Sequence, residues 1–344
     1  MSILDSLFGD TDKHTPKPLS DADSDMRKVL DTLADLGGLP IETLTAELAR
    51  HQPTPADAAQ KILRERKLDR VADLGVLTED ITVRGAAGPL QARVYKMHES
   101  DKPHPVVVYF HGGGWVIADL NVYDSSPRAI AKFADAIVVS VHYRQAPENK
   151  FPAAHDDAFA AYKWVLENAA SFGGDPARVA VMGESAGGNL AINVAIAARD
   201  AGVQAPAHMA LVYPLVGNDL NTESYLEYEN AKPLNKAMVE WFVEQTFDDK
   251  SQTADPRINV VGAADLAGLP SATVIRAQID PLCSEGEALA EKLDAAGVEV
   301  RGKTFEGVTH EFFGMGLVVK DAAAAEMFVA HELKRAFGTA ILPI

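Results

Sequence analysis

Short apolar runs alternate along this chain with longer stretches in which apolar residues recur every three or four positions. The short runs predict buried strands at residues 105–110, 136–143, 178–183, 208–215, 272–278 and 299–306. The longer stretches predict helices that end at glycine, as at 155–174, 185–202, 284–297 and 321–338. This order favours an α/β fold with a mostly parallel sheet and helices on both faces.

Three regions do not follow this alternation of predicted strands and helices. Residues 76–85 and 90–97 alternate apolar and polar side chains, which predicts an antiparallel pair. Residues 1–75 are predicted to be helical, with one apolar face formed by Met26, Val29, Leu30, Leu33 and Leu36. Residues 217–255 form an aromatic-rich, helical interruption. We therefore predict a core at 76–216 and 256–344, with the other two regions lying above the sheet.

Composition narrows the classes of function. The chain has 344 residues, 47% of them apolar, and a net charge of −17, which argues against nucleic-acid binding and disfavours anionic membranes. No apolar run spans a bilayer and no secretory signal is evident, so we expect no transmembrane segment and a cytoplasmic location. The single cysteine excludes an intrachain disulfide. Neither zinc-ligand spacing nor a phosphate loop occurs, so no metal or cofactor is expected.

A G-x-S-x-G pattern at 183–187 places Ser185 between a predicted strand and a predicted helix. This context is typical of a nucleophile elbow, in which a sharp turn exposes the serine hydroxyl at a helix N-terminus. The small residues at Gly183 and Gly187 allow the strand and helix to pass closely. On its own, the pattern also fits a plain tight turn.

The run HGGGW at 111–115 directly follows a predicted buried strand. Three successive glycines let backbone N–H groups converge on one point, as an oxyanion hole requires. We predict Gly113 and Gly114 as donors, together with the N–H group of Ala186. The alternative is a flexible turn.

Nucleophilic serine chemistry also needs a base and an acid that orients it. Of ten histidines, His310 lies in a loop directly after the last predicted strand, and Asp280 ends the strand before it. The order Ser185, Asp280, His310 is the one found in α/β-hydrolases. Taken singly, Asp280 could be a helix-capping turn residue and His310 a loop histidine.

These motifs resemble those of the hormone-sensitive-lipase-like carboxylesterases. The matching segments are HGGGW at 111–115, YRQAPE at 143–148, FPAAHDDA at 151–158, GESAGGN at 183–189, DPLCSEG at 280–286 and THEFFGM at 309–315. The resemblance implies an α/β-hydrolase fold with an eight-stranded sheet, and a helical cap built from 1–75 and 217–255. It implies Ser185 as nucleophile, His310 as base and Asp280 as its orienter. Glu184 and Ser284 depart from the family, which more often has Asp at both positions.

The expected function is hydrolysis of short- to medium-chain carboxylic esters through an acyl-enzyme, with a small-molecule ester as partner. Candidate pocket residues are Trp115, Tyr213, Trp241, Phe242, Phe312, Phe313 and Met315. Glu184 is expected to hold the elbow through hydrogen bonds. Amides, lactones or carbamates as substrates, a non-catalytic ligand-binding role and a homodimer all stay open at this point.

Overall fold

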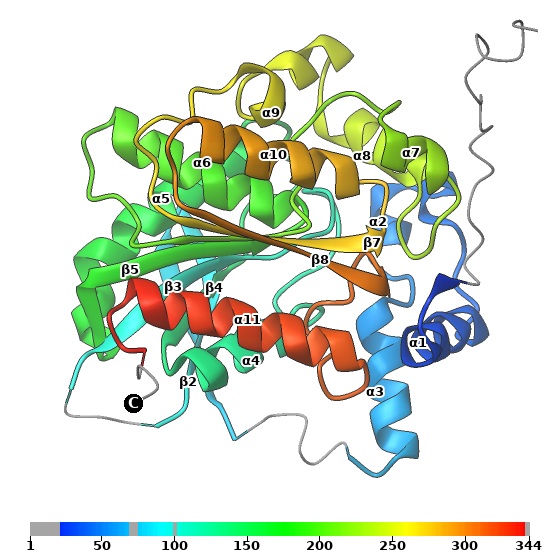
Figure 1. The fold of residues 1–344 in the computed structure, drawn as a ribbon, viewed down its shortest axis with the longest axis horizontal. Coiled ribbons are helices and arrows are strands. Elements are labelled where there is room, and N and C mark those ends of the chain that lie inside the picture. The colour runs from blue at the N-terminus through cyan, green and yellow to red at the C-terminus, as the bar shows by residue number, and fades with distance from the viewer. Residues whose placement is uncertain (1–20, 69–74, 99–101, 341–344) are drawn as a thin grey trace, which may run out of the picture.

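The computed structural model describes residues 21–68, 75–98 and 102–340, which form one eight-stranded sheet flanked by helices (Figure 1). The strands are β1 (Leu77–Arg84), β2 (Pro89–Lys96), β3 (His104–Phe110), β4 (Ile137–Val141), β5 (Gly174–Glu184), β6 (Met209–Val212), β7 (Ala272–Ile279) and β8 (Val300–Thr309). Their order across the sheet is β1-β2-β4-β3-β5-β6-β7-β8. β1 and β2 are antiparallel, β2 also runs antiparallel to β4, and the rest are parallel.

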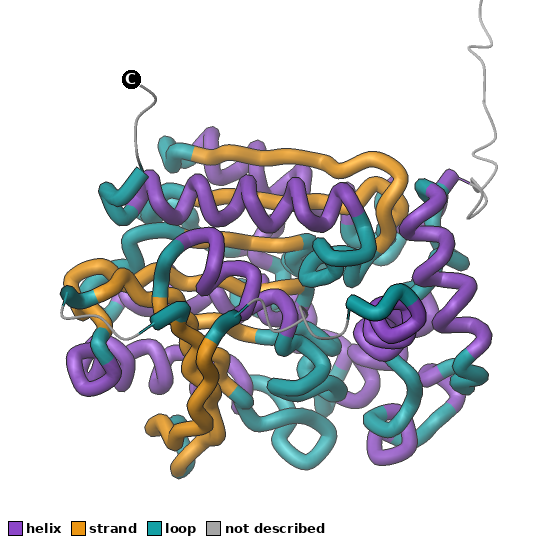
Figure 2. The backbone as a smooth tube through the Cα atoms, turned by 90° about the horizontal axis from the view of Figure 1, so that it is seen from below, coloured by secondary structure: helices purple, strands orange, loops and turns teal. Residues whose placement is uncertain are grey.

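Helices cover both faces of the twisted sheet (Figure 2). The α-helices are α1 (Ser24–Asp35), α2 (Ala46–Ala49), α3 (Pro55–Glu65), α4 (Ser125–Ala134), α5 (Ala153–Asn168), α6 (Ala186–Asp200), α7 (Glu223–Glu227), α8 (Lys236–Thr246), α9 (Val260–Ala263), α10 (Cys283–Ala295) and α11 (Lys320–Ala336). Short 3₁₀ turns occur at η3 (Ile41–Thr43), η5 (Ala169–Phe172) and η6 (Lys250–Ala254).

The alternation of side chains along β3 divides the core into two layers. Val106, Val108 and Phe110 join the apolar cluster that includes α5, α6 and α10. Val107 and Tyr109 point to the other face, where α4 and α11 pack. All five side chains are fully buried, which explains why this strand reads as a continuous apolar run.

The predicted α/β-hydrolase-type sheet, eight-stranded and mostly parallel with helices on both faces, is confirmed, whereas part of the N-terminal region lies outside the described residues. Residues 1–20 and 69–74 of the predicted helical stretch 1–75 lie outside the described residues. Within the remainder, α1 and α3 occupy the two predicted helical stretches, and the short η3 and α2 between them were not predicted. Residues 217–255 contain α7, α8 and η6. Figure 1 shows α1, α2, α7 and α8 gathered beyond the arrowheads of β7 and β8.

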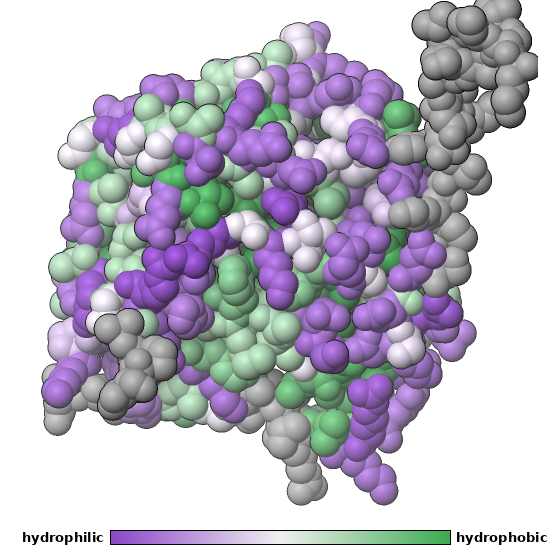
Figure 3. Space-filling view, viewed as in Figure 1, coloured by the Kyte–Doolittle hydropathy of each residue, from purple (hydrophilic) through white to green (hydrophobic). Residues whose placement is uncertain are grey.

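The surface seen in Figure 3 is largely hydrophilic. Figure 3 shows hydrophilic side chains spread over the face toward the viewer, with apolar residues in smaller patches between them. No helix in the described ranges is both long and apolar enough to cross a bilayer.

Candidate active site

Ser185 occupies a strained turn between β5 and α6. Its backbone angles are φ 56° and ψ −120°, a left-handed conformation that residues other than glycine rarely adopt. A side chain at Gly183 would meet the carbonyl group of Gly187, and one at Gly187 would meet the carbonyl group of Phe110. The close approach of strand and helix therefore requires glycine at both positions, and the packed surroundings hold the turn in place.

Asp280 and His310 follow the adjacent parallel strands β7 and β8 and meet at the same edge of the sheet. The Nδ1 atom of His310 lies 2.7 Å from Oδ2 of Asp280, and both side chains are buried. The other carboxylate oxygen of Asp280 accepts a hydrogen bond from the N–H group of Leu282. With Nδ1–H donating to the carboxylate, the Nε2 atom of His310 is left as a proton acceptor.

The surroundings of His310 favour its charged form. Burial lowers the pKa of the imidazole, but the charge of Asp280 and the hydrogen bond to it raise the pKa, with smaller contributions from Glu311 and Glu184. The net result is a pKa above the ordinary value of 6.5. An imidazole in this setting is suited to taking a proton and holding it while a neighbouring group reacts.

A cavity of about 430 Å³ lies at the carboxyl edge of the sheet. Ser185, His310, Gly113 and Gly114 all line it, so the structure brings four of the predicted site residues to one cavity. Asp280 and Ala186 are fully buried beside them. Most of the wall is apolar and comes from two distant regions, with Leu30, Leu33 and Ile41 from the N-terminal part and Leu234, Met238 and Phe242 from the inserted part.

The glycine run after β3 adopts backbone angles that suit glycine. Gly113 has φ 92° and Gly114 has φ 58°. A side chain at Gly113 would meet the carbonyl group of Ile117, and one at Gly114 would meet the ring of Phe242. Within the described part of the chain, no acceptor is recorded for the N–H groups of Gly113 and Gly114. These amides border the cavity and can serve as donors to an anionic oxygen.

Glu184 lies directly beneath the turn and is fully buried. Its carboxyl group accepts hydrogen bonds from the hydroxyl groups of Tyr109, at 2.6 Å, and of Tyr213, at 2.5 Å. Burial raises the pKa of Glu184 to about 7, although these hydrogen bonds lower it. The hydrogen bonds connect β5, β3 and the end of β6, as expected for a residue that holds the elbow.

Five of the six aromatic residues proposed above for the substrate pocket do not border the cavity. They are buried in the surrounding core: Trp115, Tyr213, Trp241, Phe312 and Phe313. Trp115 packs against His155 and Phe247, and the indole N–H group of Trp241 donates to the carbonyl group of Leu44. Of the two remaining candidates, Phe242 lines the cavity and Met315 does not.

Tyr123 and Glu311 also line the cavity and were not predicted from the sequence. Glu311 is adjacent to His310, which was the only signal available for it. Tyr123 lies 62 residues before Ser185 in a loop, and no pattern in the sequence indicates that it reaches the cavity.

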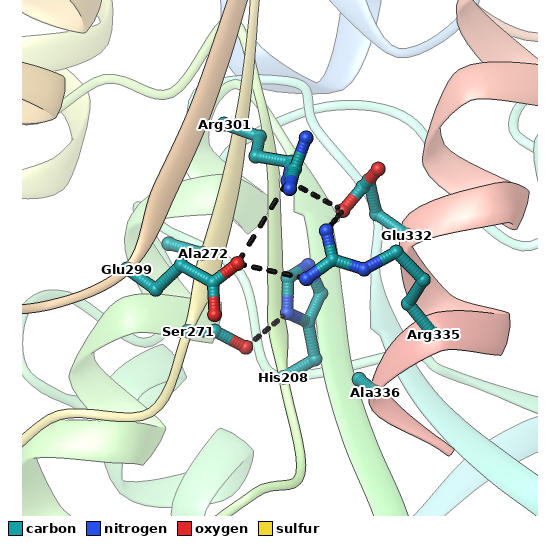
Figure 4. A pocket seen from close by; sticks show the side chains of 8 residues that line it. All are labelled: His208, Ser271, Ala272, Glu299, Arg301, Glu332, Arg335 and Ala336. Carbon is teal, nitrogen blue, oxygen red and sulfur yellow. Dashed lines mark hydrogen bonds and ion pairs between the residues drawn. The ribbon is translucent and has the colours of Figure 1, made fainter. Parts of the chain in front are cut away.

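A second, smaller cavity of about 170 Å³ lies at the amino ends of β6, β7 and β8, on the opposite edge of the sheet (Figure 4). It contains another serine–histidine pair, in which Nδ1 of His208 lies 2.8 Å from Oγ of Ser271. The other ring nitrogen of His208 contacts the hydroxyl group of Thr273 instead of a carboxylate. Burial lowers the pKa of His208 to about 4. Both of its ring nitrogens lie against hydroxyl groups, whereas Nδ1 of His310 lies against the carboxylate of Asp280.

The nearby charges in this second cavity neutralise one another. Arg335 pairs with Glu299 and Glu332, and Arg301 pairs with Glu332 (Figure 4). Across the described ranges, no group of three or more His, Cys, Asp or Glu side chains is arranged to hold a metal ion.

Comparisons with known proteins agree with the fold. A family model described as alpha/beta hydrolase fold matches residues 107–314. Carboxylesterase NlhH of Mycobacterium tuberculosis is 44% identical over 236 residues, which cover 67% of this chain and 74% of that protein. An ethyl acetate hydrolase of Pseudomonas putida is 31% identical over 302 residues, or 86% of this chain and 92% of that protein.

Solved structures show the same arrangement of the backbone. A hyperthermophilic esterase from the archaeon Pyrobaculum calidifontis superposes with a TM-score of 0.83 at 34% identity. The alignment covers 93% of this chain and 99% of that structure.

Proposed function

Because the chain belongs to the α/β-hydrolase family of hormone-sensitive-lipase-like carboxylesterases, it is a carboxylic ester hydrolase, and we propose that Ser185 is its nucleophile. His310 acts as general base and Asp280 orients it. The N–H groups of Gly113, Gly114 and Ala186 form the oxyanion hole. The observation that carries this assignment is the 2.7 Å contact between His310 and Asp280 beside the cavity that Ser185 lines.

The reaction proceeds in two steps. Nε2 of His310 takes the proton from the Ser185 hydroxyl group as the oxygen attacks the ester carbonyl carbon. The negative charge that develops on the carbonyl oxygen is stabilised by the three backbone donors, each worth about 3–4 kcal/mol of barrier. His310 then gives its proton to the departing alcohol. A water molecule, activated by the same imidazole, releases the acid and restores Ser185.

The substrate class follows from the cavity. A volume of about 430 Å³ with largely apolar walls fits small esters with short to medium acyl chains. The ethyl acetate hydrolase among the relatives acts on an ester of this size, by its name. A cytoplasmic location and a homodimer stay predictions from the sequence.

Labelling with a fluorophosphonate probe tests the nucleophile, because such probes react with an activated serine. The wild-type protein is expected to be labelled once, Ser185→Ala to lose the label, and Ser271→Ala to keep it. Ser271 is the matched control, since it also contacts a histidine. Labelling that persists in Ser185→Ala and disappears in Ser271→Ala would move the active site to the second cavity.

A substrate panel tests the reaction type. Aryl esters of two to sixteen acyl carbons are compared with anilides of the same acids, with initial rates as the readout. We expect hydrolysis of esters with acyl chains up to about eight carbons and little turnover of anilides. A preference for anilides, or maximal rates with the longest chains, would contradict the proposed substrate class.

A further inference from the structure

Glu311, directly after His310, has an unusual backbone conformation. Its φ is 67°, in the left-handed region that residues with a side chain of this size rarely adopt. Its side chain is partly buried and lines the same cavity as Ser185 and His310. Strain of this kind persists only where other contacts hold the residue in place.

The main contact of Glu311 is with Tyr123, which lies 188 residues earlier in the chain. The hydroxyl group of Tyr123 donates a short hydrogen bond to Oε1 of Glu311. The same hydroxyl group packs so closely against Gly112 that a side chain there would overlap with it. Tyr123 therefore joins the loop that carries His310 to the glycine run that carries Gly113 and Gly114.

We propose that Glu311 is a positioning residue: its bond to Tyr123 holds the His310 loop against the glycine run, and its carboxylate stabilises the imidazolium that forms during the reaction. This inference rests on the proposed function and adds to it a residue outside the Ser185, His310 and Asp280 set. Glu311 touches no reacting bond and acts through His310.

The electrostatic surroundings of Glu311 support this role. The titratable groups that face it are His310, Asp280, Glu184, Tyr109, Tyr123 and Tyr213. Arg50 and Lys232 line the same cavity, and Arg50 is paired with Glu148. Burial raises the pKa of Glu311, while the charge of His310 and the bond from Tyr123 oppose that shift. Glu311 and His310 are therefore coupled, and removing the charge of one changes the titration of the other.

Three variants separate the charge of Glu311 from its bond. Glu311→Gln removes the charge and keeps an oxygen that can accept from Tyr123, whereas Tyr123→Phe keeps the charge and removes the bond. Glu306→Gln is the matched control, because Glu306 is exposed on β8 only five residues away. The readouts are kcat and KM for a short-chain aryl ester between pH 5 and 9, with circular dichroism as a check of folding.

For Glu311→Gln we expect the acid limb of kcat/KM to move down by about half to one pH unit. For Tyr123→Phe we expect a loss of about 3- to 10-fold in kcat without a downward shift of the limb. Glu306→Gln is expected to match the wild type. If Glu311→Gln does not fold, Glu311→Gly removes the same charge, suits the backbone angle and should show the same shift.

An acid limb that stays within 0.2 pH units of wild type in the charge-removing variant overturns the electrostatic part of the inference. Wild-type kcat in Tyr123→Phe overturns the positioning part. Failure of the proposed function is a separate result, since it appears in the wild-type protein as absence of fluorophosphonate labelling and of ester hydrolysis.

Discussion

The phenol ring of Tyr213 lies against the imidazole ring of His310, with 4.4 Å between ring centroids. The hydroxyl group of the same tyrosine donates to Glu184, the residue next to Ser185. Tyr213 thus contacts the proposed base with its ring and the elbow with its hydroxyl group. The imidazole is held by this ring contact and by the hydrogen bond to Asp280.

Tyr213→Phe is expected to reduce the free energy of unfolding by about 1–3 kcal/mol, because it leaves the buried Glu184 carboxyl group with one donor fewer. The ring contact with His310 remains, so kcat should fall less than about 10-fold. Urea unfolding and initial rates on one protein preparation measure both effects. Tyr228→Phe serves as a comparison, because Tyr228 directly follows α7 and is remote from Glu184 in the sequence. A large loss of kcat with unchanged stability would contradict this division of roles.

Asp280→Asn is expected to lower kcat by about 10⁴-fold, because an amide can hold the imidazole in the wrong tautomer. Rates with an aryl ester at pH 8 check this. Asp294→Asn, an exposed position on α10, is the control and should retain wild-type rates. A loss below 10-fold for Asp280→Asn would show that His310 does not depend on this carboxylate.

The acid limb of kcat/KM should lie above pH 6.5, since the pKa of His310 is raised above that value. The direction follows from the chemistry: a protonated imidazole cannot take the Ser185 proton, so activity falls as pH falls through the raised pKa. A pH–rate profile between pH 5 and 9 measures it. Enzyme held at each pH and returned to pH 8 should recover full activity. A limb below pH 6.5 would argue against the net effect of the surrounding carboxylates.

Gly113→Ala is expected to lower kcat by about 100-fold or more. An added methyl group would meet the carbonyl oxygen of Ile117, and φ 92° disfavours alanine, so the loop must move and its N–H group with it. Gly302→Ala on β8 is the control, because the nearest atom to its added methyl group is the flexible end of Arg276 at 3.3 Å. Equal rates for the two variants would remove Gly113 from the oxyanion hole.

In the wild type, the free energy of unfolding is expected to contain a contribution from Glu326 that is lost between pH 5 and pH 8. In Glu326→Gln this loss is absent, so the variant should lose about 1–3 kcal/mol less over that range than the wild type. Burial raises the pKa of Glu326 to about 8, although its hydrogen bonds from Gly316 and Gly314 lower it. The folded protein therefore binds a proton that the unfolded chain releases, and stability falls as pH rises from about 4.5 to 8. Urea unfolding at both values measures the difference. Parallel pH dependence in variant and wild type would contradict it.

The sheet was predictable because its central strands are buried on both faces and read as unbroken apolar runs. Local start signals were equally clear: Thr54 and Asp57 form a reciprocal capping box at α3, with Pro55 in the first turn. The short helices η3 and α2, between α1 and α3, span only three and four residues and are too short to show a periodic pattern.

The placement of the candidate catalytic residues was predictable for a related reason, since Ser185, Asp280 and His310 each directly follow a strand and parallel strands end at one edge of the sheet. The residues of the cavity wall were not predictable from the sequence. Met26 and Val29 are fully buried in the core, whereas Leu30 and Leu33 from the same apolar face of α1 border the cavity. Helical periodicity places all four on one side of the helix but cannot distinguish a neighbour made of protein from an empty volume. Residue type has a separate limitation: a loop aromatic can pack in the core or border a cavity, and Trp115 and Phe312, predicted as pocket residues, pack in the core.

The proposed catalytic residues and the helices that enclose the cavity lie in separate stretches of the chain. Ser185, Asp280 and His310 are anchored to the sheet, whereas α1, η3 and α8 close the volume above them. Replacements in those helices are therefore expected to change which molecules enter the cavity, while Ser185, Asp280 and His310 keep their places at the edge of the sheet. In a protein built this way, substrate selection and the rate of turnover can therefore change independently of each other.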